Sequence, residues 1–100
     1  MLMAKVVGSV VSTQKDETLV GKKLMIIQPI NAERQDIRFQ QVAADTVGAG
    51  IGDYVLLTSG SSARKLFSTP SDAVDYAIVG IIDTFDSVSY THLRAHETTL

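Results

Sequence analysis

Five short runs of alternating or β-branched apolar residues divide this chain into candidate strands. They span residues 4–13, 22–30, 37–47, 54–58 and 77–84, and polar or glycine-rich segments separate them. Alternation with a period of two is typical of half-buried strands, and valine and isoleucine pack well on a pleated surface. The pattern therefore predicts five β-strands.

Several local features refine these elements. Gly8 interrupts the first run and predicts a bulge or bend there, while Pro29 has no N–H and should lie near a strand end or on an edge. The segment "GSSARKLF" (60–67) predicts a single helical turn with Ser61 or Ser62 as its N-cap. Residues 73–76 predict either a short helix or the approach to the last strand.

Five short strands and one brief helix late in the chain predict an all-β fold, a small five-stranded OB-like barrel. The chain has no internal repeat and no linker long enough to divide it, so we expect one barrel domain over residues 1–86. Residues 87–100 lack the strand pattern, and we interpret them as a non-native or disordered tail of frameshifted, read-through or vector origin.

Composition excludes several classes of protein. Hydrophobic residues make up 45% of the 100 residues, which excludes a disordered chain, and the balance of 9 Lys+Arg against 11 Asp+Glu gives no basic excess for nucleic acid. Without cysteine there is no disulfide framework and no thiolate metal site. A domain of this size buries only about two-thirds of its unfolded surface, so oligomerisation would stabilise it.

The apolar start of the chain raises the question of a leader or a membrane span. Residues 1–11 carry one lysine and resemble a signal peptide in composition, but they alternate and are β-branched. No apolar run reaches the roughly 20 residues that a membrane helix needs. A first strand is therefore the preferred interpretation, and no membrane partner is expected.

The stretch from Gly48 to Lys65, "GAGIGDYVLLTSGSSARK", has the glycines and the lysine of a phosphate-binding loop. It does not match G-x-x-x-x-G-K-[ST], because Gly60 precedes Ser61 and no Ser or Thr follows Lys65. We expect the glycines to supply positive φ angles or close backbone approach instead. No cofactor is predicted.

The sequence also gives little support for a catalytic or metal-binding site. His92 and His96 stand four apart and would face one metal on a helix, but Glu97 lies outside the pair, so two solvated histidines are the favoured interpretation.

Three aspartates, Asp45, Asp53 and Asp83, lie nearest to strand ends, where a pair could serve in acid–base chemistry. The barrel region has no histidine and the chain has no cysteine, so Ser61 and Ser62 have no obvious base to activate them. We therefore favour structural aspartates, which cap turns or pair with Arg64 or Lys15. No catalytic residue is predicted, and the protein is not expected to be an enzyme.

An OB-type module that binds single-stranded nucleic acid or a small ligand is the alternative function. Such modules use aromatic side chains on a basic face. The aromatic residues here are scattered along the chain: Phe39, Tyr54, Phe67, Tyr76, Phe85 and Tyr90. With a net charge of −2, nucleic acid is not the expected partner.

Five sequence blocks in a fixed order provide a more specific signal. They are "GSVVSTQK" (8–15), "LVGKKLMIIQ" (19–28), "VAADTVGAGIGDYVLL" (42–57), "GSSAR" (60–64) and "AIVGIIDT" (77–84). Over residues 1–85 the chain resembles the EutN/CcmL family of bacterial microcompartment vertex proteins. The segments "STQK", "LVGKKL" and "GSSARKLF" look closest to the propanediol-utilisation type, which favours a metabolosome over a carboxysome.

The resemblance implies a structural protein without cofactor or catalysis. It implies that the barrel assembles into a cyclic homopentamer, which caps a vertex of an icosahedral shell tiled by hexameric shell proteins. It also implies a place in the microcompartment shell within the bacterial cytoplasm.

A cyclic ring joins two different surfaces of each subunit, and small side chains let backbones approach closely around its axis. The residues that we expect at the pore or at the subunit interface are Gly60, Ser61, Ser62, Arg64, Thr13, Lys15 and Asp45. The planar fork of Arg64 suits a neighbouring carboxylate, such as that of Asp45, or carbonyl groups. The serines either line a narrow opening or cap their own helical turn, and the loop holding Thr13 and Lys15 competes for the position nearest the axis.

Overall fold

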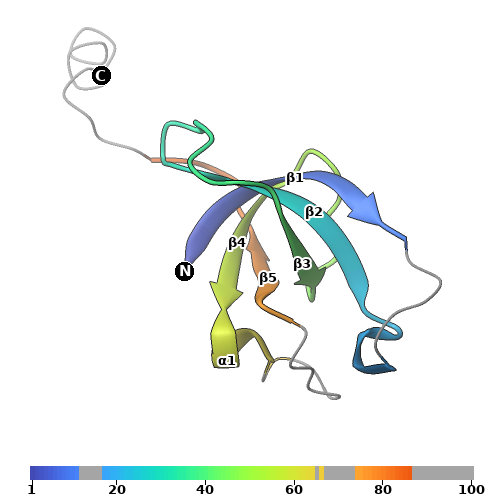
Figure 1. Cartoon of the computed structure of the whole chain (residues 1–100). Helices are drawn as coiled ribbons and strands as arrows, with labels where there is room; N and C mark the ends of the chain where they lie inside the picture. The colour runs from blue at the N-terminus through green and yellow to red at the C-terminus, as the bar shows by residue number, and fades with distance from the viewer. Residues whose placement is uncertain (12–16, 65, 67–73, 87–100) are drawn as a thin grey trace, which may run out of the picture.

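The computed structural model describes residues 1–11, 17–64, 66 and 74–86. Its elements are β1 (Leu2–Val10), a 3-10 turn (Glu17–Leu19), β2 (Lys23–Ile30), β3 (Gln41–Asp45), β4 (Tyr54–Ser59), α1 (Gly60–Arg64) and β5 (Tyr76–Ile81). The strands form a closed barrel in the order β1-β2-β3-β5-β4, and β4 pairs back with β1 (Figure 1). The predicted all-β barrel of five strands with one short helix is confirmed.

Every neighbouring pair in the barrel is antiparallel except β3 and β5, which run parallel. The chain must therefore cross the barrel after β3, make β4 and α1, and return with β5 between β3 and β4. Because β5 pairs with both β3 and β4, the last strand in the chain closes the barrel.

The first two strands match their predicted features. The β1–β2 register shifts between Val6 and Gly8, which confirms the bulge. A side chain at Gly8 would lie 3.3 Å from Cδ1 of Ile26, so glycine also permits the close approach of the two strands. Pro29 is the next-to-last residue of β2, as predicted for a residue without an N–H.

The predicted third strand, residues 37–47, is too long at both ends. The Asn31 side-chain oxygen accepts hydrogen bonds from the N–H groups of Glu33 and Gln35. After this turn Asp36 bridges to Ile30 and the N–H of Ile37 donates to the Pro29 carbonyl, but residues 38–40 are exposed and outside the strand. At the other end, the carboxylate of Asp45 accepts the N–H of Val47 and turns the chain. Side-chain hydrogen bonds to the backbone thus form turns near both ends of the predicted segment.

The last strand and the helix also begin or end differently from the prediction. The last strand ends at Ile81 instead of residue 84, although the N–H of Ile82 still donates to the Tyr54 carbonyl at 2.7 Å. The helix begins at Gly60, so neither Ser61 nor Ser62 occupies the N-cap position, and that expectation is wrong. Residues 12, 13, 65, 67 and 73 of the predicted elements lie outside the described residues, as does the predicted tail, residues 87–100.

Inward-facing side chains from all five strands fill the barrel. The residues of this main core are buried almost completely: Ala4, Val6, Met25, Ile27, Ala43, Ala49, Val55, Leu57 and Ile78. A second cluster joins Ala63 of α1 to Ala44, Val74 and Ala77. Because Ala63 is the residue of α1 that enters this cluster, it fixes which side of the helix faces the barrel.

Candidate subunit interface

Asp45 lies at the end of β3 and organises the loop that follows. Its carboxylate accepts the N–H groups of Val47 at 3.0 Å and Ala49 at 2.9 Å, and the Nζ of Lys23 stands 3.7 Å away. The same Nζ donates to the Ala49 carbonyl at 2.7 Å. The side chain of Asp45 is 2% exposed, so three donors surround a buried carboxylate. Its cationic neighbour is Lys23, on the strand that pairs with β3.

Asp53 performs a similar task at the far end of the same loop, where its carboxylate accepts the N–H of Gly50 at 2.8 Å. The prediction that aspartates at strand ends cap turns is confirmed for Asp45 and Asp53. Their cationic neighbour was expected to be Arg64 or Lys15, and for Asp45 the neighbour in the described residues is instead Lys23. Asp83, the third candidate, is exposed after β5.

Glycines in the stretch from residue 48 to residue 65 have positive φ angles, as predicted. Gly48 and Gly52 have φ angles of 78° and 97°, in the left-handed region that side chains disfavour. Gly60 has a φ of 65° where β4 turns into α1, and its N–H donates to the Asp75 carbonyl at 3.0 Å. The amide of Gly60 therefore joins α1 to the start of β5.

Three of the remaining predicted interface residues, Ser61, Ser62 and Arg64, belong to α1. Ser61 and Ser62 are exposed, whereas Ala63 is buried. Arg64 is the last residue of α1, but the description does not extend to its side chain, and Thr13 and Lys15 lie outside the described residues. Asp45 is linked to α1 through its neighbour Ala44, which shares a cluster with Ala63.

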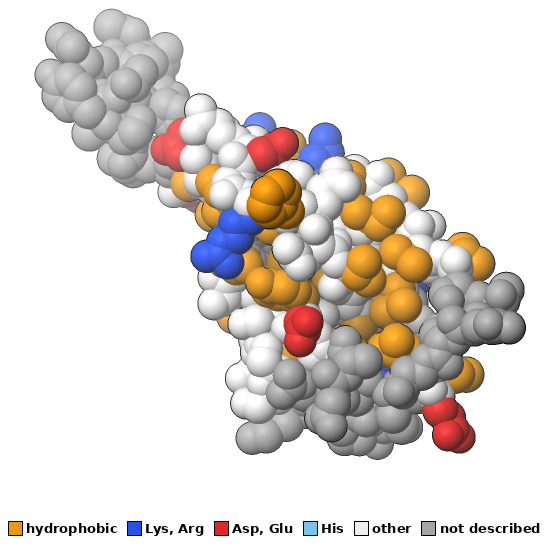
Figure 2. Space-filling view, viewed as in Figure 1, with side chains coloured by type: hydrophobic (Ala, Val, Ile, Leu, Met, Phe, Trp, Pro, Cys, Tyr) orange, Lys and Arg blue, Asp and Glu red, His pale blue; other side chains and the backbone are white. Residues whose placement is uncertain are grey.

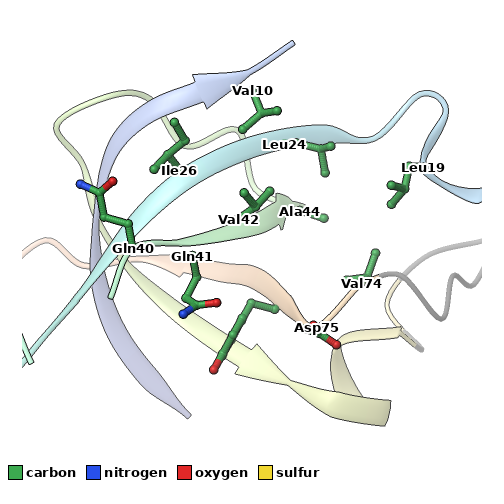
Figure 3. A pocket seen from close by; sticks show the side chains of 11 residues that line it. Val10, Leu19, Leu24, Ile26, Gln40, Gln41, Val42, Ala44, Val74 and Asp75 are labelled. Carbon is green, nitrogen blue, oxygen red and sulfur yellow. The ribbon is translucent and has the colours of Figure 1, made fainter. Parts of the chain in front are cut away.

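An apolar groove on the outside of the barrel was missed by the sequence analysis. Its volume is about 570 Å³, and Figure 3 shows Leu24 and Ile26 of β2 beside Val42 and Ala44 of β3 in its wall. The full lining is Val10, Leu19, Leu24, Ile26, Gln40, Gln41, Val42, Ala44, Val74, Asp75 and Tyr76. The unbroken run "LMII" in β2 was the available signal, because a continuous apolar strand is typical of burial on both faces.

The described aromatic residues lie in two places. Tyr54 and Phe85 pack edge to face with ring centroids 5.2 Å apart, and the Arg34 guanidinium lies 4.8 Å from the Phe85 ring. Phe39 and Tyr76 line a separate hollow, and Phe39 is 88% exposed. Phe67 and Tyr90 lie outside the described residues.

Within the part of the chain that the structure describes, no group of three or more His, Cys, Asp or Glu residues is arranged to hold a metal ion. His92 and His96 lie outside that part. No described helix has both the length and the apolar character that a membrane span requires.

Comparison with known proteins places this barrel in a family. Residues 1–83 match the family model of the ethanolamine utilisation protein EutN/carboxysome group. The chain is 49% identical over 88 residues to the microcompartment shell vertex protein PduN of Salmonella typhimurium, a match that covers 84% of this chain and 97% of the relative. It is 48% identical over 85 residues to the carboxysome shell vertex protein CcmL of Nostoc, covering 84% of each chain.

A solved structure shares the fold over the same region. The pentameric microcompartment shell protein GrpN from Rhodospirillum rubrum superposes with a TM-score of 0.77 at 42% identity, and the match covers 89% of this chain and all of that one. Because the family model and the relatives cover nearly the whole barrel, the chain belongs to the EutN/CcmL family.

Proposed function

We propose that this protein is the vertex subunit of a bacterial microcompartment shell, and that five copies form a closed ring there. The main support is the match along the whole barrel to shell vertex proteins, together with the pentameric GrpN structure. The identity to PduN favours a metabolosome shell. The ring would sit among hexameric shell proteins in the bacterial cytoplasm.

The described site favours a structural role over catalysis. Asp45 and Asp53, two of the three candidate catalytic carboxylates, are both engaged by backbone N–H groups of one loop. A carboxylate held in this way stabilises a turn and is poorly placed to exchange protons with a substrate. The apolar groove outside the barrel also suits a protein surface better than a polar substrate.

Solution mass tests this proposal. We expect a particle of about 54 kDa, which is five copies of the 10.8 kDa chain, in light scattering at micromolar concentration and physiological salt. A monomer under these conditions would contradict the proposal. A monomer that also binds single-stranded oligonucleotide with strong salt dependence would support the OB-type binding module instead.

The exposed serines of α1 suit a position near the five-fold axis. Small hydroxyl side chains permit a narrow opening and keep it hydrated without a fixed charge. Ser61→Trp or Ser62→Trp should therefore block ring closure or fill the opening, as seen by solution mass and by electron microscopy along the axis. Normal pentamers with an open axis in both variants would place α1 at the periphery of the ring.

A further inference from the structure

Neighbouring outward positions of β2 and β3 are apolar, and Ala44 and Leu24 among them pack in or against the second core cluster. Leu24 pairs with Ala44 and Ile26 pairs with Val42, so these four side chains lie next to each other across the two strands. Val42 is 49% exposed, and Figure 2 shows hydrophobic side chains gathered over β1, β2 and β3. Because Met25, Ile27 and Ala43 point into the core, both faces of this strand pair are apolar.

The apolar surface continues beyond the two strands. Gln41 and Tyr76 line both the groove and a second hollow, which is formed with Ile37, Arg38 and Phe39. Phe39 projects almost fully into solvent, and no ion pair joins the Arg38 guanidinium to another described residue. We call the surface formed by Leu24, Ile26, Phe39, Val42 and Tyr76 the β2–β3 face.

A different apolar hollow lies on the other side of the barrel. It has a volume of about 430 Å³, and Met3 of β1, Leu56 of β4 and Ile82 line it together with Phe85. Gly80 pairs with Leu56 in the register of β4 and β5, and the Leu56 side chain lies over it, since a Cβ at Gly80 would stand 3.4 Å from Cδ1 of Leu56. We call the surface formed by Met3, Leu56, Ile82 and Phe85 the β1–β4–β5 face. Since β4 stands between β5 and β1 in the strand order, this face is turned away from the β2–β3 pair.

We propose that the β2–β3 face of one subunit packs against the β1–β4–β5 face of a second copy of this chain. This inference rests on the proposed function, because a ring of five needs two different and complementary surfaces on each subunit. Monomeric proteins rarely expose continuous apolar patches, and this barrel carries partly exposed apolar hollows on two different sides. A self-complementary contact through either face alone would produce dimers and leave the other face uncovered.

One charged contact fits the same pairing. Asp83 and Asp86 border the hollow of the β1–β4–β5 face, while the hollows of the β2–β3 face carry Arg38 beside Asp36, and Asp75. The cations near the acidic hollow are already engaged, since Lys5 and Arg34 both lie over the Tyr54 ring, at 5.7 Å and 5.6 Å. Arg38 of one subunit would therefore meet the acidic rim of the next, and opposite charges at a rim favour the correct partner surface.

Chemical cross-linking tests the pairing in the assembled ring. The chain has no cysteine, so Val42→Cys and Thr84→Cys place the only thiols at the β2–β3 face and at the edge of the β1–β4–β5 face. With a short bis-maleimide, the double variant should give covalent species up to the pentamer, and each single variant should give none. Cross-linked dimers from either single variant would show a self-complementary contact and overturn the inference.

Charge substitutions then test each face separately. Val42→Glu and Ile82→Glu should each lose the pentamer, and an equimolar mixture at high concentration should form a 1:1 dimer of about 22 kDa, two copies of the 10.8 kDa chain, through the one intact pair of faces. Ile51→Glu is the matched control, because Ile51 is 68% exposed and lines neither hollow. It should keep the pentamer.

The outcomes separate this inference from the proposed function. A monomeric parent chain would contradict the proposed function itself. A pentameric parent whose Val42→Glu and Ile82→Glu variants also remain pentameric would overturn only the pairing of the two faces, as would loss of the pentamer in Ile51→Glu. If a glutamate variant does not fold, as judged by circular dichroism, the cross-linking pattern decides.

Discussion

Replacing Asp45 by alanine is expected to destabilise the subunit by about 2–3 kcal/mol, because a buried N–H loses its acceptor. The carboxylate accepts two N–H groups, and one of them belongs to Ala49, which is part of the main core. The contact with Lys23 adds little to this figure, since the lysine side chain is half exposed. Thermal unfolding at one fixed chain concentration should show a fall in Tm of about 10–20 °C.

Two further variants distinguish the hydrogen bonds from the charge. Asp45→Asn keeps one oxygen as an acceptor but presents an NH₂ group to the second donor, so we expect an intermediate loss. Glu33→Ala removes a carboxylate that is exposed in the turn after β2, and it should leave Tm unchanged. If Asp45→Ala lost the pentamer with its Tm unchanged, the residue would act at the subunit interface, as the sequence analysis expected, and not in the loop.

Replacing Ile27 by alanine is expected to destabilise the subunit by about 3–4 kcal/mol, more than the loss of the Asp45 carboxylate. Ile27 is fully buried at the centre of β2, between Val6 on β1 and Gln41 on β3. A barrel closed by hydrogen bonds on every side cannot collapse around the lost atoms, so a cavity remains. Denaturant unfolding at fixed chain concentration measures the loss.

Ile51 supplies the matched control for this change. The same substitution, Ile51→Ala, removes the same atoms from a side chain that is largely exposed in the loop before β4, and it should change stability by less than about 0.5 kcal/mol. Equal effects of the two substitutions would contradict the assignment of Ile27 to the barrel core.

The sequence by itself determined the strands and much of their local geometry. Period-two alternation selects the inward side chains of a strand whatever its neighbours are, so β2 and β4 lie close to their predicted positions. The bulge at Gly8 and the positive φ angles at Gly48 and Gly60 depend on the residue's own missing side chain, and they were equally predictable. Family membership followed from five ordered blocks.

Only the tertiary structure decided which distant groups meet. The cation beside Asp45 is Lys23 because β2 pairs with β3, and no local window of sequence contains that pairing. The start of β3 was misplaced because residues 38–40 leave the ladder between the Ile30–Asp36 bridge and the pairing of Ile27 with Gln41. The two apolar outer faces were missed because alternation shows only which residues face inward. The strand order β1-β2-β3-β5-β4 is what gathers the outward residues into surfaces.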